Sequence, residues 1–144
     1  MNILVIHGPN LHLLGKRKKE IYGKTTLKEL NKILNDFASK NKINLKIFQS
    51  NSEGEIIDII TKNMKWANFI IINPAAYTHY SYAIRDCIEA VEIPTIEVHL
   101  SNIMKREKFR KKSVIKDVCI KQIYGKGIDS YIEAINFCIN LNEK

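Results

Sequence analysis

The sequence predicts a three-layer α/β domain in which helices cover both faces of a five-stranded parallel β-sheet. Two observations lead to this fold class. Short apolar runs of strand length alternate along the chain with amphipathic helical patterns, and these runs are continuous in apolar residues instead of alternating with polar ones. Continuous runs are typical of strands buried on both faces, as in a parallel sheet. The chain of 144 residues has the length of one ordinary domain, and we expect a single domain over residues 1–144.

Five apolar runs are predicted to be the strands. In chain order they comprise residues 3–6, 45–48, 69–72, 95–98 and 118–123. The first run lies directly at the N-terminus, without a basic leader or a cleavage site. We therefore expect a core strand there and no signal peptide.

Four amphipathic stretches are predicted to be helices. The first begins at Thr26, where Thr26 and Glu29 have the spacing of a capping box, and its apolar residues follow at helical spacing. These residues are Leu30, Ile33, Leu34 and Phe37. The other three stretches comprise residues 52–64, 80–91 and 129–141, and a short helix is expected before the last strand. This order of elements predicts a doubly wound domain with a flavodoxin-like strand order.

Polar and turn-forming residues are concentrated in the segments that directly follow the strands. These segments are residues 7–11, 49–54, 73–79 and 99–102. In an open parallel sheet the ligand lies beyond the carboxyl ends of the strands, where the strand order reverses. The sequence therefore predicts a functional site at this one end of the sheet.

The composition limits the classes of partner. Lys and Arg number 23 against 15 Asp and Glu, so the formal net charge is +8 and anionic partners are favoured. A nucleic-acid binder would interleave basic residues with exposed aromatic ones, but the basic run at 105–112 contains only Phe109. The net charge itself does not distinguish a polymer from a small anionic substrate, and the basic run does not favour nucleic acid. We expect no membrane segment, because no run approaches the roughly 18 apolar residues of a membrane helix.

The three cysteines indicate the compartment. Cys87, Cys119 and Cys138 are widely spaced and form no CxxC pair. We interpret them as reduced, buried, small hydrophobic residues of a cytoplasmic protein.

Four groups of residues at the predicted site end carry a specific resemblance. They are His7-Gly-Pro-Asn-Leu with Leu14-Gly-x-Arg17 and Tyr22-Gly, then Gln49-Ser-Asn-x-Glu-Gly, then Asn73-Pro-x-Ala-Tyr-x-His79, and finally Glu97-Val-His99-Leu-Ser101-Asn with Arg106 and Arg110. In this order and spacing the set resembles the type II 3-dehydroquinate dehydratases. The match runs from the first strand to the last helix.

The resemblance implies an activity and a role for individual residues. The reaction is an anti elimination of water from 3-dehydroquinate through an enolate, which gives 3-dehydroshikimate in the shikimate pathway or in quinate breakdown. The resemblance implies no cofactor and no metal, and it implies a homododecamer. It makes Tyr22 the base, Arg17 its electrostatic partner and His99 the general acid, with Asn10 holding a water near the enolate oxygen. The residues that bind substrate are then Asn73, His79, Arg110 and the backbone amides of Leu100 and Ser101, and Asp86 reaches the site of a neighbouring subunit.

The residue types suit this chemistry. An unperturbed tyrosine is only about 0.1% ionised at pH 7, so a tyrosine base needs a nearby cation. Arg17 is always charged and lies five residues before Tyr22 in a loop that is rich in glycine and lysine. Glu97 and His99 project to the same side of a strand, so the carboxylate can orient the imidazole as a general acid requires. The alternatives are that Arg17 lies in a solvated basic loop and that His99 is a structural histidine.

His7 and His12 are metal ligands in principle, but no acidic cluster accompanies them. We expect His7 to brace the loop that holds Asn10.

Ala75 stands where the family usually has glycine. A methyl group there narrows the turn if the backbone requires positive φ.

The segment after the first strand argues against two other classes of function, a phosphorylatable receiver and a flavin-binding module. A phosphorylatable receiver needs acidic residues after the first strand, where this chain has His7 and Gly8. A flavin-binding module would have a loop rich in Ser, Thr and Gly at that place, which Pro9 and Asn10 do not provide.

Overall fold

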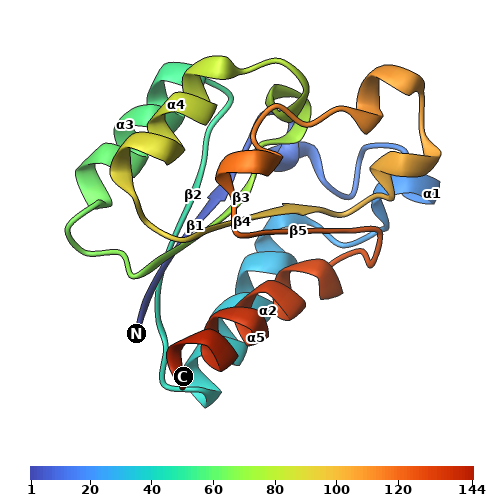
Figure 1. Cartoon of the computed structure of the whole chain (residues 1–144). Helices are drawn as coiled ribbons and strands as arrows, with labels where there is room; N and C mark the ends of the chain where they lie inside the picture. The colour runs from blue at the N-terminus through green and yellow to red at the C-terminus, as the bar shows by residue number, and fades with distance from the viewer.

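The computed structural model describes residues 1–144 and contains one five-stranded sheet, which Figure 1 shows edge-on between two layers of helices. The strands are β1 (Asn2–His7), β2 (Asn44–Gln49), β3 (Phe69–Asn73), β4 (Thr95–His99) and β5 (Lys121–Tyr124). Their order is β2-β1-β3-β4-β5, and all four neighbouring pairs are parallel. This is the flavodoxin-like order, so the predicted fold class is confirmed.

The helices form two layers. The chain has α1 (Lys19–Tyr22), α2 (Leu27–Lys40), α3 (Glu53–Asn63), α4 (Tyr82–Val91) and α5 (Asp129–Asn142). Helices α3 and α4 cover one face of the sheet, and α2 and α5 cover the other (Figure 1). Each layer has its own buried apolar cluster against the sheet. The α2–α5 side contains Leu30, Leu34 and Tyr131, whereas the α3–α4 side contains Ile56 and Ile84.

The helix starts follow the local sequence closely. The hydroxyl of Thr26 accepts the backbone N–H of Glu29, and the Glu29 carboxylate accepts the backbone N–H of Thr26, so the predicted capping box is present. Ile33, expected on the apolar face of α2, is exposed instead. Helix α4 begins after Ser81, whose hydroxyl caps it, and not at Tyr80, which lies outside the helix and is exposed.

The prediction of strands buried on both faces holds for the centre of the sheet and is wrong at its edges. Strands β1, β3 and β4 are almost completely buried, but β2 alternates between exposed and half-buried residues. Strand β5 begins at Lys121, and Val118 belongs to a 3-10 turn (Lys116–Val118). The single short helix expected before β5 is also wrong, because three 3-10 turns occupy this segment. The other two are Ile103–Lys105 and Lys108–Lys111.

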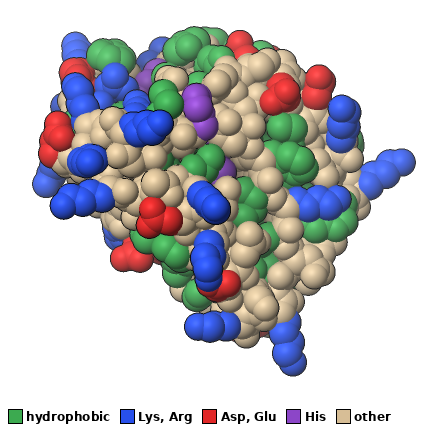
Figure 2. All heavy atoms as spheres, turned by 180° about the vertical axis from the view of Figure 1, so that it is seen from behind, with side chains coloured by type: hydrophobic (Ala, Val, Ile, Leu, Met, Phe, Trp, Pro, Cys, Tyr) green, Lys and Arg blue, Asp and Glu red, His purple; other side chains and the backbone are tan.

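The surface carries the excess of positive charge. Figure 2 shows Lys and Arg side chains over much of one face, with Asp and Glu side chains between them, so that on this face the basic residues do not form an unbroken stripe. None of the helices combines the length and the apolar character that crossing a membrane requires.

Candidate active site

A pocket lies at the carboxyl ends of β1, β3 and β4, where the strand order reverses. Its lining comprises Pro9, Asn10, Leu11, Arg17, Tyr22, Asn73, Ala75, Ala76, His79, His99, Leu100, Ser101, Ile103, Arg106 and Arg110. Nine of the eleven predicted site residues are therefore gathered in one place. The remaining two are Glu97, which is buried beneath His99, and Asp86, which is exposed on α4 and outside this pocket.

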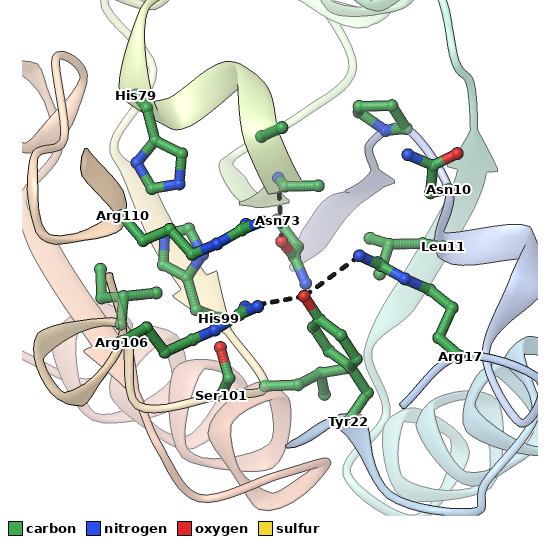
Figure 3. Close-up of a pocket in the computed structure, with 15 residues that line it drawn as sticks. Asn10, Leu11, Arg17, Tyr22, Asn73, His79, His99, Ser101, Arg106 and Arg110 are labelled. Atoms are coloured by element: carbon green, nitrogen blue, oxygen red, sulfur yellow. Dashed lines mark hydrogen bonds between the residues drawn. The ribbon is translucent and has the colours of Figure 1, made fainter. Parts of the chain in front are cut away.

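The hydroxyl of Tyr22 lies between two guanidinium groups. Arg17 donates a hydrogen bond from Nη2 to the Tyr22 oxygen over 3.1 Å, and Arg106 donates from Nη1 over 2.7 Å. Figure 3 shows the two arginines approaching this oxygen from opposite sides. Hydrogen bonds from cationic donors favour the ionised form of the group that accepts them. The Tyr22 oxygen therefore accepts hydrogen bonds from two cationic side chains at once.

His99 is joined to a buried carboxylate. Its Nε2 lies 2.5 Å from Oε2 of Glu97, and the residues are 5% and 0% exposed. With Glu97 ionised, Nε2 carries the proton of this contact, and Nδ1 remains for the pocket. His99 can then donate a proton into the pocket only from Nδ1 of an imidazolium.

Glu97 collects hydrogen bonds from three further side chains. The Thr78 hydroxyl donates over 2.7 Å, the Ser113 hydroxyl over 2.8 Å and the Gln122 amide over 3.1 Å. Burial on its own would raise the pKa of Glu97, but the hydrogen bond and charge of His99, together with the bonds from Thr78 and Gln122, bring this pKa below its usual value. The carboxylate is thus ionised and fixed in orientation.

His79 and Arg110 lie side by side in the pocket (Figure 3). The Nδ1 atom of His79 donates to the carbonyl of Lys112 over 2.7 Å. Burial lowers the pKa of His79, and the charges of His99 and Arg110 lower it further. A neutral His79 with Nδ1 protonated presents Nε2 as a hydrogen-bond acceptor.

Arg110 is ion-paired with a neighbouring carboxylate. Its Nε lies 2.9 Å from Oε2 of Glu107, although this N–H makes no well-directed hydrogen bond. The side chain is partly buried and lines the pocket. A guanidinium in the pocket wall is suited to an anionic ligand.

His7 does not brace the Asn10 loop as expected. It is fully buried, with Nε2 2.8 Å from Oδ1 of Asn31 on α2 and Nδ1 2.9 Å from the hydroxyl of Tyr131 on α5. Burial lowers its pKa to about 4, although the bond to Asn31 acts in the opposite direction. His7 therefore joins the end of β1 to both helices of one layer. No group of three or more His, Cys, Asp or Glu side chains is placed to hold a metal ion.

Ala75 adopts the conformation that the sequence raised as a question. Its φ is +52°, in the left-handed region, and its backbone N–H donates to Oδ1 of Asn73 over 3.1 Å. The turn therefore requires positive φ and accommodates alanine. Asn73 remains in the pocket lining with its side-chain oxygen occupied by this bond.

The sequence interpretation missed four residues. Arg106, in the basic run at 105–112, was given no role in the expected chemistry, but its side chain is only 13% exposed and contacts Tyr22. The sequence does contain a signal for Arg106, because Arg106 and Arg110 are the only arginines in a run whose other basic residues are lysines. The three donors to Glu97 had no comparable signal, because they come from three separate segments. They are Thr78, Ser113 and Gln122.

Comparisons with known proteins agree with one another. Residues 1–139 match the family model described as dehydroquinase class II. A 3-dehydroquinate dehydratase of Caldicellulosiruptor saccharolyticus is 59% identical over 134 residues, which are 92% of each chain. A protein of the same name from Halothermothrix orenii is 51% identical over 99% of this chain and 96% of its own. The crystal structure of a type II dehydroquinase from Butyrivibrio crossotus superposes with a TM-score of 0.94 at 48% identity, covering 95% of this chain and 96% of that one.

Proposed function

The chain belongs to the class II dehydroquinase family, and we propose that the pocket at the carboxyl end of its sheet removes water from 3-dehydroquinate to give 3-dehydroshikimate. One observation carries the assignment of this pocket. It holds a phenol oxygen between two guanidinium groups and, on another wall, an imidazole paired with a buried carboxylate. These are a base and an acid, the two groups that an anti elimination requires on different sides of its substrate.

Tyr22 acts as the base. Its phenolate oxygen takes a proton from the carbon next to the substrate ketone, and the electron pair of that C–H bond moves to form an enolate. Arg17 and Arg106 favour the phenolate before this step. A water held by the Asn10 side chain donates to the enolate oxygen, where negative charge develops.

His99 acts as the acid. As the enolate electrons return to form the carbon–carbon double bond, the bond to the leaving hydroxyl breaks, and the imidazolium gives its Nδ1 proton to that oxygen. Water leaves, and His99 remains as a neutral imidazole that keeps its Nε2 proton and donates it in the hydrogen bond to the ionised Glu97. The Tyr22 proton returns to solvent, and a new proton on His99 completes the cycle.

The remaining polar groups of the pocket bind the substrate. The guanidinium of Arg110 in the pocket wall suits the carboxylate, and the free Nε2 of His79 accepts from a ring hydroxyl. Asn73 and the backbone amides of Leu100 and Ser101 complete the polar contacts. No cofactor takes part in any step.

Assembly and location are further parts of the proposal. Asp86 is exposed on α4 and outside its own chain's pocket, so it is available to complete the site of a neighbouring copy. We propose a homo-oligomer, a dodecamer by family resemblance, in which residues 1–144 are one catalytic domain that works in the cytoplasm. Sedimentation tests this, because a fully active monomer would contradict the role of Asp86.

The activity has a direct assay. The product is a conjugated enone, so its ultraviolet absorbance rises when 3-dehydroquinate is added to the purified chain. Borohydride added with substrate distinguishes the route, because a lysine Schiff base would be trapped as a covalent adduct whereas the enolate route leaves the protein unmodified and active. A folded chain that gives no enone would overturn the proposal.

A further inference from the structure

The segment Gln49–Gly54 carries a motif for which neither the pocket lining nor the proposed mechanism has a role. Its side chains nevertheless contact the loop that carries Asn10. We infer that Asn51 is a positioning residue that fixes Asn10 at the edge of the pocket, so that the Asn10 side chain can hold the water beside the enolate oxygen. This inference rests on the proposed function and deepens it.

Asn10 needs an external support. Its backbone is left-handed, with φ 69° and ψ −1°, and its side chain does not cap the turn that follows. Asparagine adopts this conformation more readily than other residues except glycine, so its cost here is at most about 1 kcal/mol. The backbone N–H of Asn10 donates to Oδ1 of Asn51 over 3.0 Å. This contact joins the end of β1 to the end of β2 beside the pocket.

Asn51 is itself held from two directions. Gln49 donates from Nε2 to Oδ1 of Asn51 over 3.1 Å and to the carbonyl of Gly8 over 3.2 Å. The hydroxyl of Tyr77 donates to the backbone carbonyl of Asn51 over 2.7 Å. The side-chain oxygen of Asn51 thus accepts two hydrogen bonds and is fixed relative to β1, β2 and the turn after β3.

The rest of the loop has anchors of its own. The backbone N–H of Gly8 donates to the carbonyl of Asn73 over 2.8 Å, and a Cβ atom at Gly8 would lie 2.7 Å from the carbonyl carbon of Pro74. On the other side of Asn10, Leu11 is buried in the core. Loss of the Asn51 oxygen therefore releases Asn10 alone and leaves the fold around it in place.

The kinetic consequence follows from when the Asn10 contact is made. A water beside the enolate oxygen acts mainly in the transition state, so Asn51→Ala should lower kcat about tenfold and change KM by less than about threefold. Asn51→Asp keeps an acceptor at the same place and should restore most of kcat. Tyr77→Phe, which releases the Asn51 backbone but keeps the aromatic ring, should lower kcat in the same direction by a smaller factor.

A double-mutant comparison separates positioning from a general loss of structure. If Asn51 acts through Asn10, then adding Asn51→Ala to Asn10→Ala should cause almost no further loss of kcat. The matched control is Asn44→Ala, because Asn44 also links β2 to β1, through Oδ1 of Asn2, but at the opposite end of the sheet. This variant should keep the wild-type kcat.

Four kinetic results would overturn the inference. They are wild-type kcat in Asn51→Ala, equal losses in Asn51→Ala and Asn51→Asp, losses that multiply in the double variant, and a change in KM alone. A thermal melt of each variant accompanies the kinetics, and an Asn51→Ala chain that has lost its cooperative melt would contradict the local role. Absence of dehydration by the wild-type chain is a separate result, which would overturn the proposed function together with this inference.

Discussion

The pocket wall that carries His99 and the wall that carries Tyr22 are constructed in different ways. His99 and Glu97 belong to a central strand, are almost completely buried and take part in a network with three further side chains. Tyr22 ends α1, a helix of four residues with no buried side chain, and Gly23 follows it at φ 82°. We call the wall with His99 and Glu97 the acid wall and the wall with Tyr22 the base wall. The fold fixes the acid wall, whereas the base wall is held by the hydrogen bonds from Arg17 and Arg106 to Tyr22.

This difference separates two kinds of dependence. A change at the acid wall disturbs a buried network, so it should alter the free energy of unfolding and the activity together. A change at the base wall removes a partly buried group that belongs to no buried polar network, so it should alter the activity and leave the stability almost unchanged. Variants at the two walls can therefore test the comparison directly.

The largest effect on activity is expected at the base. Tyr22→Phe removes the phenol oxygen and keeps the ring, so kcat should fall on the order of 10³-fold while KM changes little. The melting temperature should stay within a few degrees of wild type, because α1 buries none of its side chains. Tyr82→Phe, at an exposed tyrosine on α4, is the control. Near-wild-type turnover, measured while proton abstraction limits the rate, would mean that another residue is the base.

At the acid wall, one substitution should affect both properties. Glu97→Gln places an amide among donors that need an acceptor, so kcat should fall on the order of 10²-fold. The free energy of unfolding should fall by about 2 kcal/mol, because a buried donor loses its partner. Urea unfolding and steady-state kinetics measure the two quantities. Glu133→Gln, at an exposed carboxylate paired with Lys126, should change neither. A loss of activity without a loss of stability would contradict the buried network.

The two arginines at Tyr22 should each contribute to turnover. Arg106→Ala and Arg17→Ala each remove one cationic donor, so each should lower kcat by about tenfold or more and move the pH–rate profile to higher pH. The Lys variants should recover only part of kcat, because an ammonium restores the charge but not the planar fork. Lys105→Ala, in the same basic run, should have little effect. If the kcat of Arg106→Ala stayed within twofold of wild type, Arg17 alone would be the cation that supports Tyr22.

The smallest effect on activity and a clear effect on stability are expected at His7. The unfolded chain protonates this histidine near pH 6.5, whereas the folded chain resists protonation until about pH 4. The stability that a neutral His7 contributes is therefore complete above pH 6.5 and is lost as the pH falls from 6.5 to 4, by about 3 kcal/mol. His79, whose pKa is also lowered, adds to the same slope. The contribution of His7 is measured as the difference in unfolding free energy between wild type and His7→Gln, followed from pH 6.5 to pH 4. An identical pH slope in both proteins would contradict it, and the exposed His12→Gln is the control.

The sequence predicted the centre of the fold better than its edges, for a physical reason. Strands β1, β3 and β4 have neighbours on both sides and helices on both faces, so their apolar runs are continuous and easy to identify. Strands β2 and β5 lie at the edges, where one side meets solvent and the pattern becomes mixed. Val118 is apolar because it packs near the α3–α4 cluster, not because it is part of a strand.

The site was predicted as far as its motifs extend. Tyr22, Arg17 and His99 lie in short patterns that define a chemistry, and they come together in the pocket. Arg106 reaches Tyr22 only because the segment after β4 returns over the pocket in 3-10 turns, which leave no apolar period in the sequence. The partners of Glu97 depend on contacts between distant segments, and such contacts are not visible in local patterns.

The left-handed Ala75 has a consequence for the design of ligands. This residue is part of the pocket wall, and its methyl group fills space that a glycine at the same position would leave open. An inhibitor that fills the corresponding space in a glycine-bearing relative would meet a steric clash in this chain. A smaller or flatter inhibitor would bind both. One carbon atom in a turn after β3 is thus a basis for selectivity between enzymes whose catalytic groups are the same.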